Sequence, residues 1–185
     1  TLFNVGAFRR LRKDMDLRVE GYYTRTSNYI SSEDHKYPAI RYSDNIDRVW
    51  TKGAELEFNR SATAGLGIYF NYNFYIVNWH DDSLEIEPFL MELTPKHRFN
   101  TRLSYLLLKS TTLSLDTRGV IGRSSKSGLS MDDYFILNAG IEQKLFRRNF
   151  IINLRMENIF DIDYQEIYGY PMPGRTIALF ASYSW

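Results

Sequence analysis

Hydrophobic and polar side chains alternate with a period of two along most of this 185-residue chain, and no other feature constrains the fold as strongly. Over positions 66–76 every even position is hydrophobic or aromatic, and Asn71 and Asn73 lie between them. A period of two indicates a β-strand with two chemically different faces, because successive side chains point to opposite sides. The pattern predicts an all-β, antiparallel fold of about nine strands, near residues 2–9, 17–24, 54–59, 66–76, 98–107, 113–121, 135–141, 150–157 and 177–185.

Strand length and connection length together indicate a transmembrane β-barrel segment. Counted from one connection to the next, the expected strands have about 9–13 residues, which matches a tilted strand that crosses a bilayer. Short periplasmic turns that alternate with long extracellular loops are the pattern of bacterial outer-membrane barrels. The connections here alternate between short ones, near 10–14, 60–65, 109–111 and 146–149, and long ones, near 28–47, 79–95, 123–132 and 161–173.

Composition excludes several other classes of protein. The chain has no run of about 18 apolar residues, so no transmembrane helix is expected. It contains 14 Tyr and 12 Phe, and aromatic side chains are enriched where a barrel meets the membrane surfaces. A net charge of +1 provides no broad basic field for nucleic acid. The absence of cysteine excludes a disulfide framework, a thiolate metal site and a cysteine nucleophile.

The strand count also bears on whether the barrel is complete. If the C-terminus ends on the short-turn side, about nine strands place Thr1 on the long-loop side, whereas a complete single-chain bacterial barrel has an even number of strands. We therefore expect residues 1–185 to be the C-terminal part of a larger barrel. The other strands would come from an N-terminal segment or a second chain. If the first expected strand is wrong, the count becomes eight and this argument fails.

The C-terminal quarter of the chain carries two specific motifs. Asn153–Tyr164 includes Asn-Ile-Phe-Asp followed by a tyrosine, and Gly169–Arg175 reads Gly-Tyr-Pro-Met-Pro-Gly-Arg. Both resemble motifs of TonB-dependent outer-membrane receptors, with Ile159 in place of Leu, Ile162 in place of Lys, and Trp185 in place of the usual terminal Phe. Thr51–Glu57 and Pro95–Phe99 resemble strand openings of the same family. The residues that carry the signature are Asn158, Phe160, Asp161, Tyr164, Gly169, Tyr170, Pro171, Pro173, Gly174 and Arg175.

The resemblance implies a 22-stranded barrel around an N-terminal plug domain, in the outer membrane of a Gram-negative bacterium. It implies import of a scarce chelate, such as a ferric siderophore, haem or cobalamin, with no cofactor. The implied partners are outer-membrane lipid, the rest of the barrel with its plug, the TonB complex, and the barrel assembly machinery. The plug and the N-terminal strands lie outside this sequence. The last strand would face lipid and serve as an assembly signal through Ile177, Leu179, Ala181, Tyr183 and Trp185.

Charged residues recur on the face expected to line the lumen. Because positive and negative charges are mixed, we favour ion pairs in a water-filled interior. A substrate pathway through the lumen is the alternative. The set comprises Arg18, Glu20, Glu55, Glu57, Arg98, Arg102, Asp116, Arg118, Glu142, Arg155 and Glu157.

Two of the expected extracellular loops contain residues that could contact a ligand. His80, Asp81 and Asp82 precede two further acidic residues, and oxygen ligands with one histidine could hold a divalent cation. The spacing matches no compact calcium loop, so solvated loop charge is the favoured interpretation. His35 and Tyr37 form a second candidate pair, because loops commonly carry function.

No enzyme motif is present. The chain lacks Gly-x-Ser-x-Gly, a phosphate-binding loop and His-Glu-x-x-His. An outer-membrane lipase or protease would need a nucleophile or carboxylate beside a histidine near the rim, and His97 is the only candidate position. We therefore expect no catalytic activity. The remaining alternative is a self-contained structural or adhesive barrel of eight strands, whose interior would be filled by side chains.

Overall fold

The computed structural model describes residues 1–33, 42–62, 65–80, 94–108, 110–124, 130–146 and 149–184. Nine strands form one sheet in the order β1-β2-β3-β4-β5-β6-β9-β10-β13, and neighbouring strands are antiparallel. They are β1 (Leu2–Arg12), β2 (Met15–Glu33), β3 (Tyr42–Arg60), β4 (Leu66–His80), β5 (His97–Leu107), β6 (Thr111–Ile121), β9 (Tyr134–Leu145), β10 (Phe150–Glu157) and β13 (Thr176–Tyr183). Two small hairpins pair β7 (Arg123–Ser124) with β8 (Ser130–Met131), and β11 (Gln165–Ile167) with β12 (Tyr170–Pro171). No helix in the described residues is long and apolar enough to cross a membrane.

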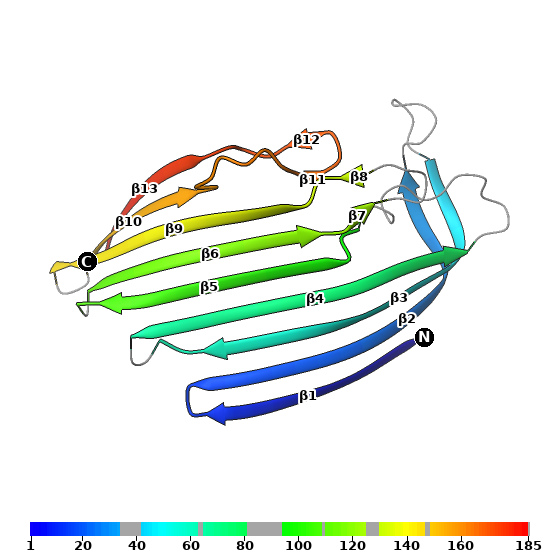
Figure 1. Cartoon of the computed structure of the whole chain (residues 1–185), viewed down its shortest axis with the longest axis horizontal. Helices are drawn as coiled ribbons and strands as arrows, with labels where there is room; N and C mark the ends of the chain where they lie inside the picture. Colours follow the sequence, from blue (N-terminus) through cyan, green and yellow to red (C-terminus); the bar gives the residue numbers. More distant parts are fainter. Residues whose placement is uncertain are drawn as a thin grey trace.

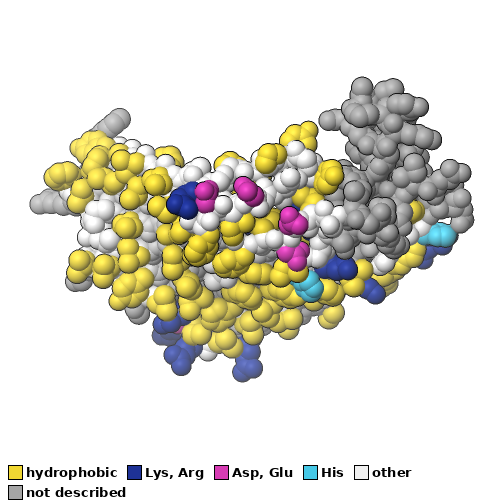
Figure 2. All heavy atoms as spheres, turned by 45° about the horizontal axis from the view of Figure 1, so that its top comes forward, with side chains coloured by type: hydrophobic (Ala, Val, Ile, Leu, Met, Phe, Trp, Pro, Cys, Tyr) yellow, Lys and Arg dark blue, Asp and Glu magenta, His cyan; other side chains and the backbone are white. Residues whose placement is uncertain are grey.

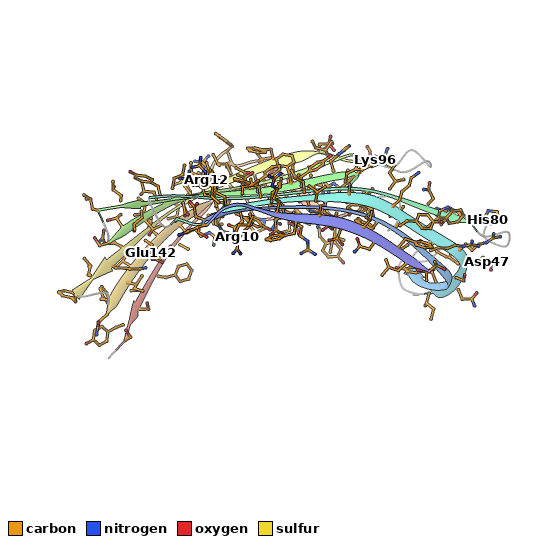
Figure 3. All side chains as sticks on the ribbon, turned by 90° about the horizontal axis from the view of Figure 1, so that it is seen from below. Arg10, Arg12, Asp47, His80, Lys96 and Glu142 are labelled. Atoms are coloured by element: carbon orange, nitrogen blue, oxygen red, sulfur yellow. The ribbon has the colours of Figure 1, made fainter. Side chains whose placement is uncertain are left out.

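The sheet is open and curved. In Figure 1 the strands run side by side from β1 at the bottom to β13 at the top, so these two strands form its edges. The short turns after β1, β3, β5 and β9 lie together at the left, and the longer connections lie at the right. Seen from below, the sheet is a shallow arch (Figure 3). The predicted all-β antiparallel fold and its nine strands are thus confirmed, and the curvature is that of a piece of barrel wall.

β2 and β3 are longer than the sequence pattern indicates. Each has 19 residues, which at roughly 3.3 Å per residue exceeds the length needed to cross a bilayer at a tilt. Much of the predicted loop 28–47 therefore belongs to strands. The two strands turn together at the right of Figure 1, beyond the point where Asn28 adopts a φ of 53° and one pair is missing from the ladder. Outside the membrane the hairpin continues because its backbone hydrogen bonds are satisfied between the two strands alone.

One face of the sheet is apolar. Leu103 pairs with Ile68 on β4 and with Leu115 on β6, and Leu115 pairs with Ala139 on β9. Because directly paired residues share a face, hydrophobic side chains form a continuous band, which we call the apolar face. Figure 2 shows hydrophobic side chains covering most of one side of the sheet. Such a broad exposed surface indicates contact with lipid. Exposed members include Val5, Val19, Tyr23, Leu66, Leu103, Leu115, Ile141, Leu154 and Leu179.

The opposite face, here called the polar face, carries the predicted lumen-facing charges. Arg102 pairs with Tyr69 and with Asp116, and Asp116 pairs with Asn138. The register places every residue of the predicted lumen-facing set on this side, including Arg18 opposite Glu57 and the Glu142 position on β9. A barrel that spans a membrane turns its apolar face to lipid and its polar face to the lumen, so the predicted separation of the two faces is confirmed.

Candidate functional site

The segment 158–175 folds back over the polar face instead of extending away from the sheet; we call it the C-terminal loop. Its Ile162 and Tyr164 side chains pack against buried Val120, Tyr134 and Ile136 of β6 and β9. The Tyr134 and Tyr164 rings lie 4.7 Å apart between centroids. This is the main hydrophobic cluster on the polar face in the described part of the chain, and it holds the loop at the long-loop end of the lumen.

Asn158 organises the start of the C-terminal loop. Its side-chain NH₂ donates to the carbonyl of Ile162 at 2.8 Å and to that of Pro173 at 3.4 Å, and its side-chain oxygen accepts from the Ile162 N–H at 2.9 Å. Its own N–H donates to the Asn138 side chain on β9. Asn158 is only 3% exposed and has a φ of 48°, a left-handed conformation that asparagine tolerates better than most residues. The Asn158 side chain therefore joins the two ends of the loop, and its backbone N–H joins them to the sheet.

Asp161 and Gly174 close the same loop. The Asp161 carboxylate accepts from the Arg175 N–H at 2.6 Å, and a Cβ placed on Gly174 would lie 2.6 Å from that carboxylate oxygen. A side chain at position 174 would therefore push the Asp161 carboxylate out of its hydrogen bond. Further along, Gly169 has a φ of 80° and donates its N–H to the Gln165 side chain at 2.8 Å, which forms the turn between β11 and β12.

Arg123 ties the C-terminal loop to the neighbouring hairpin. Its guanidinium is buried, with 4% exposure for the residue, and donates to the carbonyl of Gln165 at 2.7 Å and to that of Asp132. It also lies 5.0 Å from the centre of the Tyr134 ring, a cation–π geometry. Next to it, Arg118 forms an exposed ion pair with Glu166. Burial raises the pKa of the Tyr164 hydroxyl, and the nearby Glu166 carboxylate raises it further.

Two cavities of about 440 Å³ each lie on the polar face; Arg118 lines both, and Glu166 lines one of them. The cavity with more lining residues lies under the C-terminal loop. Two ion pairs line it: Arg102 pairs with Asp116, and Arg155 pairs with Glu157 at 3.1 Å. Guanidiniums, carboxylates, tyrosine hydroxyls and amides lie side by side there, which suits a polar, hydrogen-bonding solute or protein surface. Among the described residues, no group of His, Asp and Glu could hold a metal ion.

The structure brings together part of the predicted signature. Asn158, Asp161, Tyr164, Gly174 and Arg175 meet in the C-terminal loop, and Pro173 accepts from Asn158. Phe160 and Tyr170 are exposed, and Pro171 pairs with Gln165 in the small hairpin. Ile177, Leu179, Ala181 and Tyr183 lie on the apolar face through their pairing with β10, as expected for a lipid-facing strand. The roles of all these residues in function remain predictions.

Among the predicted ligand contacts, the structure describes His80. His35, Tyr37, Asp81, Asp82 and Trp185 lie outside the described residues. His80 ends β4 and is exposed, close to Asp47 in Figure 3. Their use in binding stays a prediction.

His97 lies on the apolar face, on the opposite side of the sheet from the two cavities. Its Nδ1 is 2.7 Å from the Tyr72 hydroxyl, and its ring lies beside those of Tyr72 and Phe74. A histidine in an aromatic cluster that faces lipid has a structural explanation, since its hydrogen-bonding atom is satisfied by a neighbouring strand. The geometry gives no reason to assign it a catalytic role.

Sequence patterns did not identify Arg123, Gln165, Glu166 and Asn138 as parts of the site. Arg123, Gln165 and Glu166 fall in segments expected to be loops, and Asn138 falls on a strand in a position that alternation marks only as polar. Their contacts span up to 48 positions along the chain, as between Arg118 and Glu166. A local pattern carries no signal for such a pairing.

Comparison with solved structures places the sheet in known barrels. The FrpB iron transporter of Neisseria meningitidis (F5-1 variant, apoprotein form) matches 98% of this chain with a TM-score of 0.78 and 13% identity, over 30% of its own length. The ferripyoverdine receptor of the Pseudomonas aeruginosa outer membrane matches 97% with a TM-score of 0.72 and 17% identity, over 26% of its length. The ferric-catecholate import receptor Fiu of K12 E. coli matches 94% with a TM-score of 0.67 and 19% identity, over 26% of its length.

The chain thus spans less than a third of the length of each of these receptors. At these identities the likeness shows the fold, that of the barrel wall in receptors and transporters of iron compounds. No curated protein sequence matches the chain significantly. The family model described as "Outer membrane protein beta-barrel family" matches residues 3–171. The nine strands and the apolar face agree with this match. The chain belongs to the outer membrane β-barrel protein family and is a component of the Gram-negative outer membrane.

Proposed function

We propose that this chain is the C-terminal barrel portion of a TonB-dependent receptor that imports a ferric chelate. The single observation that supports this most is the agreement of its whole nine-stranded sheet with the barrels of an iron transporter and of ferric siderophore receptors. The signature loop at Asn158–Arg175 is the part of the sequence that resembles such receptors. A self-contained structural barrel has no comparable support.

In this proposal the remaining strands and a plug domain come from another segment of the protein or from a second chain. The plug packs on the polar face, where exposed and half-buried charges such as Arg102, Asp116 and Arg155 offer partners for a polar protein surface. TonB acts on the plug side. The lipid-facing residues of β13, from Ile177 to Tyr183, together with Trp185, form the signal for the barrel assembly machinery.

The C-terminal loop stabilises the mouth of this barrel. Asn158, Arg123 and the contacts of Tyr164 hold it against the polar face at the long-loop end. In this proposal the chelate enters on the polar face, beside the C-terminal loop. Iron bound to a siderophore is the favoured cargo, with haem and cobalamin as the other members of the class.

Uptake by iron-starved cells tests the proposal. The gene is deleted and then restored, and uptake of radiolabelled iron is measured with a ferric catecholate, a ferric pyoverdine-type peptide chelate and haem; labelled cobalamin is tested in parallel. We expect deletion to abolish uptake of one of these compounds, restoration to recover it, and inactivation of TonB to abolish it again. If the restored, correctly folded protein changes uptake of none of them, the receptor proposal is wrong.

A further inference from the structure

One of the two cavities on the polar face has an excess of positive charge, and we call it the arginine cavity. It has a volume of about 440 Å³ and is lined by residues of β5, β6, β7, β9 and β11, which come together at the long-loop end of the sheet (Figure 1). The charged groups in its lining are the guanidiniums of Arg98, Arg118 and Arg123 and the carboxylate of Glu166. With three cations and one anion, the cavity suits a negatively charged ligand.

Arg98 and Arg118 bring two of these positive charges together on neighbouring strands. Arg98 pairs with Val120 in the register of β5 and β6, and it is therefore a diagonal neighbour of Arg118, with about 7–8 Å between them. Arg98 is exposed, and within the described part of the chain no carboxylate lies within ion-pair distance of it. Because like charges at this separation repel each other, an anion that contacts both arginines stabilises the pair.

The third guanidinium of the arginine cavity is buried without a carboxylate. Arg123 is only 4% exposed, and its two terminal nitrogens donate to the carbonyls of Gln165 and Asp132. Its Nε has no hydrogen-bond partner among the residues that the structure describes. A buried charge that is paired only with neutral groups is unfavourable. An anion bound in the cavity that Arg123 lines therefore also stabilises this charge.

Glu166 occupies part of the same cavity. Its carboxylate pairs with the Arg118 guanidinium, and the two side chains remain 39% and 51% exposed. Such an exposed ion pair contributes little to stability, because water and salt screen it. Ile167, the next residue, is exposed as well, so the Glu166 side chain has room to turn into water. A ligand anion that contacts several arginines at once can therefore take the place of the Glu166 carboxylate at Arg118.

We propose that the arginine cavity binds an organic anion with two adjacent oxygens, such as a carboxylate or a catecholate of the imported chelate, and that Glu166 competes with it for Arg118. The cargo is thereby narrowed to anionic chelates, a statement that rests on the receptor function proposed above. Two adjacent oxygens match the donor fork of a guanidinium. The Tyr134 ring and the Ile167 side chain also line the cavity, and they give the organic part of the ligand an apolar surface that an inorganic anion would not use.

Isothermal titration of the full-length protein in detergent tests this site. The probes are salicylate, which is an aromatic carboxylate, its neutral amide salicylamide, and inorganic phosphate. The test variants are Arg98→Gln and Glu166→Gln. Their matched controls are Arg10→Gln and Glu142→Gln, which make the same changes of charge on the polar face near the short-turn end; Figure 3 labels both residues. A heat-dependent shift in electrophoretic mobility establishes that each variant is folded.

We expect salicylate to bind the wild-type protein and both controls with similar affinity. Arg98→Gln should bind it about tenfold more weakly, the usual effect of losing one charge-assisted hydrogen bond. Glu166→Gln should bind it about threefold more tightly, because the exposed pair that competes with the ligand is lost. Salicylamide should bind all five proteins equally weakly.

Three results would overturn the proposal of an organic-anion site. They are no binding of salicylate by the wild type, equal binding by the folded Arg98→Gln variant, and binding of inorganic phosphate as tight as that of salicylate. An unchanged affinity in Glu166→Gln would overturn the role of Glu166 as a competitor. The titration needs neither cells nor TonB, so the anion site can fail while chelate uptake succeeds, and uptake can fail while salicylate binds.

Discussion

The Asp161 carboxylate accepts the backbone N–H of Arg175 at 2.6 Å and thereby joins the first turn of the C-terminal loop to its last residue before β13. Asp161 itself has a φ of 56°, and its N–H donates to the Asn158 carbonyl at 2.8 Å. The loop is therefore closed by local polar contacts, in addition to the packing of Tyr164 on the sheet. Residues that the sequence pattern marks only as turn formers make specific hydrogen bonds here.

Gly174→Ala should lower the free energy of unfolding by about 1–3 kcal/mol, because the added methyl group displaces the Asp161 carboxylate from its hydrogen bond to the Arg175 N–H. The added Cβ would lie 2.6 Å from the Asp161 carboxylate oxygen. Asp161→Ala removes that oxygen but also its hydrogen bond. In a double-mutant cycle, measured by guanidinium unfolding in micelles, the double variant should therefore lose less stability than the sum of the two single losses. Strict additivity would show that the two residues do not contact each other in solution.

Arg123→Ala should release the C-terminal loop from the sheet. The buried guanidinium donates to two backbone carbonyls, and its removal leaves them without a partner at a cost of about 2 kcal/mol or more. Limited proteolysis of the folded protein should then cut within 158–175 faster than in the wild type. Arg118→Gln is the matched control, since its pair with Glu166 is half-exposed and worth about 0–1 kcal/mol. Equal cleavage rates in both variants would contradict the assignment of Arg123 as the anchor.

The sequence predicts the features of this fold that depend on neighbouring residues, and it misses those that depend on contacts between distant residues. The period of two identifies all nine strands and both faces, because the alternation of side chains is a local property of the strand. It does not give the length of β2 and β3, since their outer ends are held by pairing with each other and not by a lipid boundary. The predicted loop 28–47 was too long for that reason.

The candidate site is predicted only in part. The motif at Asn158–Arg175 is visible in the sequence, yet its position over the polar face depends on Ile162 and Tyr164 meeting Val120 and Tyr134 from distant strands. Arg123 is likewise unmarked, because its partners are backbone carbonyls that no sequence pattern specifies. Long-range packing, rather than turn chemistry, determines where the loop lies.

Gly53→Ala should be far more disruptive than Gly21→Ala, although the two glycines lie in the neighbouring strands β3 and β2. A Cβ at Gly53 would lie 2.4 Å from the Phe74 carbonyl oxygen and 2.6 Å from the Tyr22 hydroxyl, whereas at Gly21 the nearest atom is 3.9 Å away. The backbone carbonyl cannot move without breaking the ladder, so we expect a loss of about 1–3 kcal/mol at Gly53. At Gly21 we expect no loss or a gain of up to about 1 kcal/mol. Unfolding in guanidinium measures both, and equal effects would mean that the β3–β4 register differs from the one described.

Leu115→Arg and Ser114→Arg place the same side chain at adjacent positions on opposite faces of β6. Leu115 is 44% exposed on the apolar face between Leu103 and Ala139, and Ser114 pairs with Ser104 and Gly140 on the polar face. An arginine that faces lipid near mid-membrane costs about 2–4 kcal/mol, whereas one on the lumen side stays hydrated. We therefore expect Leu115→Arg to lower both the free energy of unfolding and the yield of heat-modifiable barrel, and Ser114→Arg to change each by much less. If the two variants behaved alike, the assignment of the apolar face to lipid would be wrong, because water would then reach both sides of the sheet.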